Sequence, residues 1–205
     1  MKRFKIQNSG FKIRRFVAGA AVAGLFVMMN SFAKIYLNGN ARKSFDDTVY
    51  VTGDIVKVPA IVFHFDKASI WQDSAHHGMD SLKLVYEFLK GHPSLTVEIQ
   101  SHTDHECEEC STRLTYSRAC SIRDSLIKMG IDADRLVPKS YGASQPLVLE
   151  NEITLPSGKI VPRGTVLMEG MIDKIDTNRR GADNNYMRMM DRRTEIRILS
   201  TDYSK

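Results

Sequence analysis

After residue 48, the chain begins with β-branched residues and with an alternation of hydrophobic and polar positions. The segment 49–58 is rich in β-branched side chains. In the segment 61–65, the alternation places Phe63 and Phe65 on one face of an extended chain. The pattern therefore predicts two early strands.

Further along the chain, hydrophobic residues recur at a spacing of three and four residues in two segments, which predicts two amphipathic helices. The first has an N-cap at Asp73 or Ser74 and stops at Gly91 and Pro93. The second is closed by Gly130. The expected core positions are Met79, Leu82, Tyr86 and Leu89 in the first helix and Ala119, Ile122, Leu126 and Met129 in the second.

Strands and helices alternate along the chain, which predicts an α/β (α+β) two-layer sandwich with helices on one face of a mixed sheet. Three further strands are expected, at 95–99, 136–141 and 194–199. Pro and Gly residues punctuate β-prone pieces between 150 and 167, which predicts an inserted hairpin. A last helical stretch is expected at 168–190, where Asn178 and Gly181 interrupt the pattern.

The N-terminus has the three parts of a secretory signal peptide. A basic stretch precedes an apolar run at 16–29, and small residues follow at Ser31 and Ala33. The alternative is an uncleaved anchor helix, at the short limit of what spans a bilayer. The predicted organisation is a signal peptide or N-terminal anchor at 1–33, a linker at 34–47 and one domain at 48–205.

The formal charge of +5 belongs to the leader and not to the predicted domain. Residues 1–33 contain six basic residues and no acidic residue, since the first acidic residue is Asp46, and the chain without residues 1–33 carries a charge of about −1. A nucleic-acid-binding protein carries its excess of positive charge on the folded part. The charge distribution therefore argues against nucleic acid as a partner.

Five segments resemble, in order and approximate spacing, the OmpA-like C-terminal peptidoglycan-binding domains. They are FHFDKASI, VEIQSHTD, LTYSRACSIRDSLIKMGI, YGASQP and MDRRTEIRIL. The resemblance covers about residues 61 to 199 and implies an OmpA-like β-α-β-α-β core with an inserted hairpin before the last helix and strand. It also implies a wall-binding protein of the Gram-negative envelope, with no enzymatic activity, cofactor or metal.

In that family, an Asp directly after a Thr and an Arg in the following helix hold the diaminopimelate residue of the stem peptide. The matching positions are Asp104, which follows Thr103, and Arg118. Diaminopimelate offers an ammonium and a carboxylate, which require one fixed anion and one fixed cation. A guanidinium suits the carboxylate because its planar fork donates two parallel hydrogen bonds.

Two further residues complete the ligand set that the resemblance implies. Ser111 stands where the family usually has an Asn, and Arg193 lies in the closing motif. Cys107 departs from the family, which usually has a Gly at that position. A side chain there changes the backbone shape available to the loop.

The cysteines allow three interpretations. We favour a disulfide between Cys107 and Cys110, because an exported protein meets an oxidising compartment. Together with His102, His105 and Cys120, the same pair is also typical of half a zinc site or of a redox pair.

The favoured hypothesis is a non-covalent tether to peptidoglycan in the periplasm, at the cell wall or outer membrane. The alternatives are a wall-anchoring subunit of an envelope secretion or motility complex, or a metal- or thiol-dependent periplasmic protein that uses Cys107 and Cys110. Expected partners beyond peptidoglycan are outer-membrane or secretion-complex proteins, and a homodimer stays open.

Overall fold

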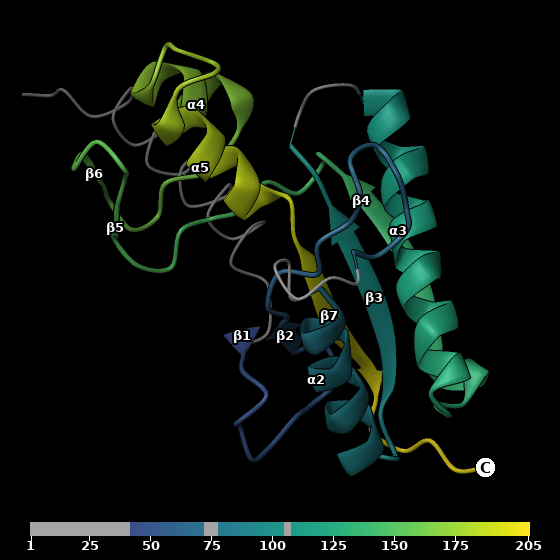
Figure 1. The fold of residues 1–205 in the computed structure, drawn as a ribbon. Coiled ribbons are helices and arrows are strands. Elements are labelled where there is room, and N and C mark those ends of the chain that lie inside the picture. The colour runs from purple at the N-terminus through teal and green to yellow at the C-terminus, as the bar shows by residue number, and fades with distance from the viewer. Residues whose placement is uncertain (1–41, 72–77, 105–107) are drawn as a thin grey trace, which may run out of the picture. The chain divides into compact units, whose positions relative to one another are not determined.

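A five-stranded mixed sheet forms the centre of the computed structural model, which describes residues 42–71, 78–104 and 108–205, without the side chains of 108–111 (Figure 1). The sheet order is β1-β2-β7-β3-β4, with β1–β2 and β3–β4 parallel and the other pairs antiparallel. The strands are β1 (Arg42–Lys43), β2 (Ile55–Lys57), β3 (Thr96–His102), β4 (Leu136–Gly142) and β7 (Thr194–Ser200). The predicted signal peptide lies outside the described residues, and β1 lies within the segment predicted as a linker.

Two helices, α2 (Gly78–Gly91) and α3 (Glu108–Lys128), pack against one face of this sheet. Their buried side chains share a single hydrophobic core with the strands. The core includes Leu82, Val85 and Leu89 of α2, Ala119, Ile122 and Leu126 of α3, and Val97, Ile99, Ile196 and Ile198 of the sheet. The two-layer arrangement of helices on a mixed sheet is therefore confirmed. No helix within the described residues is long and apolar enough to span a bilayer.

The strand predicted at 61–65 is wrong, because this segment folds into a tight hairpin. Phe63 and Ile70 form a single antiparallel bridge, and the Trp71 N–H donates to the Val62 carbonyl at 2.8 Å. Asp66 makes the turn with a φ of 52°. Backbone groups that a longer strand would offer to the sheet are used inside the hairpin.

The outer strands of the sheet are short or interrupted. β1 has 2 residues, and β4 on the other side contains Pro138 and Lys139. Between α3 and β4, the chain passes through Gly130, with a φ of 106°, and the 3₁₀ helix η1 (Ala133–Arg135). Only glycine adopts such a φ without steric cost, which explains why α3 stops there.

An insert between β4 and β7 forms a second core. It contains β5 (Ile153–Thr154) and β6 (Ile160–Val161), which pair as a hairpin, followed by α4 (Glu169–Ile175) and α5 (Ala182–Asp191). The buried residues are Leu149, Leu155, Val161, Leu167, Ile172 and Met187. The inserted hairpin is confirmed, and the predicted helical stretch is divided in two. At the break, the Asp176 carboxylate accepts the Asn184 N–H at 3.0 Å.

A buried arginine ties the end of α2 to the start of β3. The Arg135 guanidinium donates to the carbonyls of Leu89, His92 and Leu95 at 2.7 to 2.8 Å. The last carbonyls of a helix have no partner within the helix, and the helix dipole favours a cation there. Arg135 therefore satisfies the carbonyls of Leu89 and Leu95 and is a second donor to that of His92, which also accepts the Leu95 N–H at 3.2 Å.

We predict that Arg135→Met lowers the free energy of unfolding by about 3 kcal/mol, because three buried carbonyls lose charged donors. Arg123→Met is the matched control, because Arg123 is 34% exposed and its ion-pair partner among the described residues is its neighbour Asp124. Urea denaturation of both variants measures the difference. Equal stability of the two variants would contradict the assigned role of Arg135.

Candidate functional site

Asp104 lies just beyond the end of β3, between the two strands that flank it. The His102 N–H donates to the Arg193 carbonyl and the Thr103 N–H to the Gly142 carbonyl, both at 2.9 Å. These bonds continue the sheet past its last residue and carry Asp104 into the interior, where it is 3% exposed. The local backbone therefore fixes the position of this carboxylate.

Two arginines near the end of α5 hold the Asp104 carboxylate. Arg192 donates from Nε to Oδ1 at 2.8 Å and from Nη2 to Oδ2 at 2.9 Å. Arg188, one turn earlier, donates from Nη1 to Oδ2 at 3.2 Å. Burial opposes ionisation of Asp104, but the two guanidiniums outweigh it, and the pKa of Asp104 lies below its usual value. The side chain is therefore a buried carboxylate ion.

Arg118 extends from α3 over the hairpin that carries Phe63. Its Nε donates to the Lys67 carbonyl at 3.1 Å, and its guanidinium carbon lies 5.0 Å from the centre of the Phe63 ring. Among the described side chains, no carboxylate lies within ion-pair distance of Arg118. Its charge is therefore compensated mainly by a ring face and a carbonyl.

The structure brings Asp104 and Arg118 close enough to affect each other electrostatically. Burial and the charge of Arg192 lower the pKa of Arg118, whereas the carboxylates of Asp66 and Asp104 raise it. The net effect is a lowered pKa for a half-buried guanidinium. Arg188 also pairs with Asp173 at 3.5 Å, so the buried carboxylate of Asp104 belongs to a larger ion network.

Sequence reasoning missed Arg188 and the role of Arg192. It selected Arg193, which instead contacts Asp191 at 3.1 Å, Glu195 at 3.2 Å and the Gln145 carbonyl at 3.1 Å. Arg192 caps the C-terminus of α5, and Arg193 lies between it and the start of β7 at Thr194, so the two adjacent side chains have different partners. The spacing of four residues between Arg188 and Arg192 is the signal that places both on one side of α5.

The remaining predicted residues have mixed outcomes. The Thr103 hydroxyl donates to Asp104 Oδ1 at 3.2 Å. Cys107 lies outside the described residues, and the side chains of Ser111 and Cys110 are not described, so their predicted roles stay predictions. Cys120, on α3, has a free thiol. In the described ranges, no group of three or more His, Cys, Asp or Glu side chains has the geometry to hold a metal ion.

A small cavity lies on the side of Asp104 that faces the insert. Its volume is about 20 Å³, and its lining residues are Asp104, Ala143, Pro146, Leu167, Met168, Glu169, Ile172, Arg188 and Asp191. This volume holds about one water molecule. The insert therefore closes that side of Asp104 to anything larger.

A buried polar layer lies on the sheet face opposite α2 and α3. His102, with a fully buried side chain, stacks on Tyr141 with ring centroids 5.2 Å apart, and both ring nitrogens lack hydrogen-bond partners. Burial and the charges of Arg193 and Arg42 lower the pKa of His102 to about 2, although Nε2 lies 3.4 Å from a Glu195 oxygen. Burial has the opposite consequence for a nearby acid, because it raises the pKa of Asp191 to about 6.

Comparison with known families identifies the core of this fold. Residues 62–155 match the model of the OmpA family. Asp104 and Arg118 lie inside that segment, whereas Arg188 and Arg192 lie beyond it.

Two curated proteins share part of the chain. A photosystem I P700 chlorophyll a apoprotein A2 from Gloeobacter violaceus is 36% identical over 88 residues, which are 42% of this chain and 10% of that protein. Outer membrane porin F from Pseudomonas aeruginosa is 28% identical over 120 residues, which are 53% of this chain and 33% of that protein. The chain thus spans a tenth and a third of the lengths of these two relatives.

Two solved structures are similar in fold. The periplasmic domain of Helicobacter pylori MotB has 19% identity and a TM-score of 0.45, with 73% of each chain covered. The cell wall anchor of the T6SS from Pseudomonas aeruginosa has 16% identity and a TM-score of 0.43, with 68% of this chain and 75% of that chain covered.

We predict that His102 makes the protein less stable in acid. A histidine whose folded pKa lies below its unfolded value of 6.5 contributes full stability above pH 6.5 and loses it as the pH falls toward 2. Between pH 7 and pH 5, this group alone should cost about 2 kcal/mol of unfolding free energy. His102→Phe, which keeps the ring on Tyr141, should remove that loss. Urea denaturation at both pH values measures it, and an identical pH dependence in both proteins would refute the assignment.

Proposed function

We propose that this chain, in which residues 62–155 form an OmpA family domain, binds peptidoglycan non-covalently through the charged end of a stem peptide. The observation that carries the proposal is the pair of Arg118, which lacks a carboxylate partner among the described residues, and the buried carboxylate ion of Asp104. The proposed role is binding, without catalysis. In the periplasm, such binding would tether the protein to the cell wall or to the outer membrane beside it.

Arg118 is the proposed receptor for the diaminopimelate carboxylate. Only its Nε is used within the described residues, by the Lys67 carbonyl, so the two terminal nitrogens are available to a ligand. A charge-assisted pair of parallel hydrogen bonds is stronger in a half-buried site than in open water. A ligand carboxylate would also offset the positive charge that Arg118 and Arg192 place in the same region.

Asp104 is the proposed acceptor for the ligand ammonium. A carboxylate has about four acceptor positions. Three are used by the guanidiniums of Arg188 and Arg192, and the fourth by the Thr103 hydroxyl at 3.2 Å. Because the hydroxyl is the neutral donor of this set, the ammonium should replace it more easily than it replaces either arginine.

The expected affinity is that of a reversible tether. Charge-assisted hydrogen bonds contribute about 1.5 to 3 kcal/mol each. Two or three of them, less the cost of ordering the ligand, give roughly millimolar to micromolar binding. Repeated stem peptides on one polymer would raise the apparent affinity through avidity.

We predict that Arg118→Gln reduces binding to purified sacculi by about tenfold or more, because it removes a charged donor pair from the ligand carboxylate. Arg123→Gln is the matched control, since it makes the same change of charge on the same helix and should leave binding intact. Co-sedimentation of the full chain with sacculi measures both. Equal sedimentation of the two variants would overturn the assignment of Arg118, and a parent protein that does not sediment would overturn the proposed function.

We further predict that Asp104→Asn weakens sacculus binding and also lowers the melting temperature. The substitution leaves the guanidiniums of Arg188 and Arg192 without their carboxylate, and loss of one partner of a buried ion pair costs about 3 to 5 kcal/mol. Thermal unfolding followed by circular dichroism separates the two effects. Binding should be compared at a temperature where the variant is fully folded, and unchanged binding there would remove Asp104 from the site.

A further inference from the structure

An exposed phenylalanine stands at the tip of the hairpin that holds Arg118. Phe65 is 93% exposed, which is the largest exposure among the large hydrophobic side chains of the described residues. Burial of a phenylalanine side chain contributes about 1.5 to 3 kcal/mol to the free energy of folding. The exposed ring of Phe65 does not make this contribution. A rigid exposed aromatic ring of this kind is typical of a contact surface.

The hairpin holds Phe65 outward and does not leave it on a free loop. The His64 N–H donates to the Ser69 carbonyl, and the Lys67 N–H donates to the His64 carbonyl, both at 3.0 Å. Asp66, the next residue, has a φ of 52°, a conformation that costs a non-glycine residue energy and persists only when its surroundings impose it. The backbone on both sides of Phe65 is therefore fixed.

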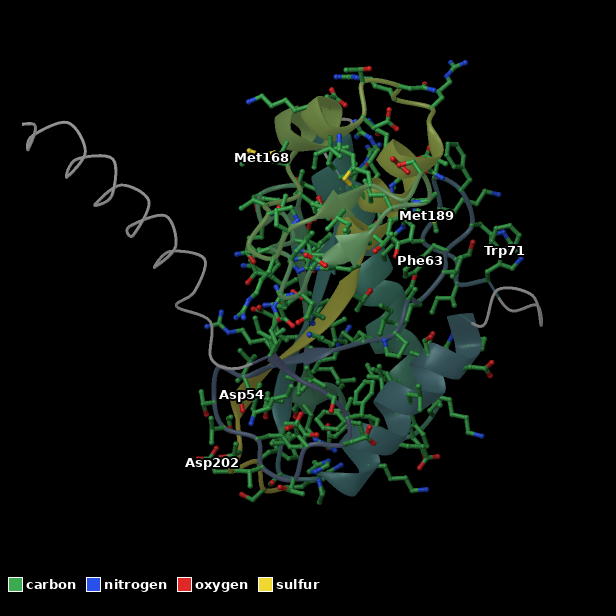
Figure 2. All side chains as sticks on the ribbon, turned by 90° about the vertical axis from the view of Figure 1, so that its left-hand side faces the viewer. Asp54, Phe63, Trp71, Met168, Met189 and Asp202 are labelled. Atoms are coloured by element: carbon green, nitrogen blue, oxygen red, sulfur yellow. The ribbon has the colours of Figure 1, made fainter. Side chains whose placement is uncertain are left out.

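A second aromatic feature lies on the same hairpin. His64 and Trp71 stack with ring centroids 4.6 Å apart and an angle of 19° between their planes. Figure 2 shows the Trp71 side chain projecting away from the ribbon. Phe65 directly follows His64 in the chain, so the hairpin carries three aromatic rings within the segment 64–71.

The hairpin is physically continuous with the proposed stem-peptide site. Lys67, whose carbonyl accepts from Arg118, is two residues from Phe65, a separation that the chain spans in about 7 Å. Phe63, on the other side of Phe65, packs under the same guanidinium. A ligand held by Arg118 therefore has the Phe65 ring within reach of whatever is attached to it.

We propose that Phe65, on the hairpin that also carries the His64–Trp71 pair, is a carbohydrate subsite that stacks on a sugar ring of the peptidoglycan glycan strand. This inference rests on the proposed function, because the stem peptide at Arg118 is covalently attached to that strand. A pyranose ring presents a flat face of C–H groups, and an aromatic ring offers it apolar area and a partially negative face. The subsite would give a stem peptide that is attached to its glycan a higher affinity than the free peptide.

The test compares two ligands on the full chain by isothermal titration calorimetry. One is a free stem peptide with diaminopimelate, and the other is the same peptide on its N-acetylglucosamine–N-acetylmuramic acid disaccharide. The parent should bind the disaccharide-peptide about fivefold more tightly than the free peptide. Phe65→Ala should abolish this preference and leave the affinity for the free peptide unchanged.

Variants at the same position separate stacking from simple hydrophobic contact. Phe65→Tyr should keep the preference because it keeps the ring, whereas Phe65→Leu should lose it although it keeps apolar area. Leu84→Ala, on the exposed side of α2, should change neither affinity. Because Phe65 is 93% exposed, none of the substitutions there removes packing from the core.

The outcomes distinguish failure of the subsite from failure of the proposed function. A parent that binds both ligands equally overturns the subsite alone, as does a Phe65→Ala variant that keeps the preference or loses affinity for both ligands to the same extent. A parent that binds neither ligand overturns the proposed function together with the subsite.

Discussion

The buried ion cluster around Asp104 joins two otherwise separate cores. Asp104 extends from the sheet, whose core is shared with α2 and α3, whereas Arg188 and Arg192 come from the insert, which has its own core. An unpaired carboxylate at 3% exposure would cost several kcal/mol, so the cluster forms only when both parts are in place. The geometry of the candidate site therefore depends on the insert as much as on the family core.

The same cluster underlies the proposal that the ligand of the candidate site is a carboxylate. The guanidiniums of Arg188 and Arg192 and the Thr103 hydroxyl fill the acceptor positions of the Asp104 carboxylate, and Arg118 lies within its electrostatic range. Arg118 has no carboxylate within ion-pair distance among the described side chains, and it lies over the Phe63 ring. Within the protein, Asp104 holds and orients the guanidiniums of Arg188 and Arg192.

Much of the fold could be predicted from the periodicity of hydrophobic residues, because the side chains that are buried in the core recur with the period of the helix or strand. Leu82, Leu89, Ile122 and Leu126 occupy the core as their spacing indicates. Periodicity failed at 61–65, where a local hairpin uses the backbone groups that a strand would have paired with the sheet.

The candidate site was predictable only in part. Asp104 could be selected because a motif places it after a strand, and the structure brings Arg118 into its electrostatic range. Whether Arg192 or Arg193 faces Asp104 depends on where α5 ends and β7 begins. Two adjacent arginines do not indicate the position of that boundary. Arg188 required knowledge that an insert folds back onto the end of β3.

The two edges of the sheet have a consequence for the proposed binding to a polymer. One edge is a strand of two residues, and the other carries a proline, which has no N–H to offer, and a lysine. Exposed strand edges are templates on which a second copy can extend the sheet, and short, charged or proline-containing edges prevent this. Molecules crowded onto one polymer at high local density would therefore resist edge-to-edge aggregation.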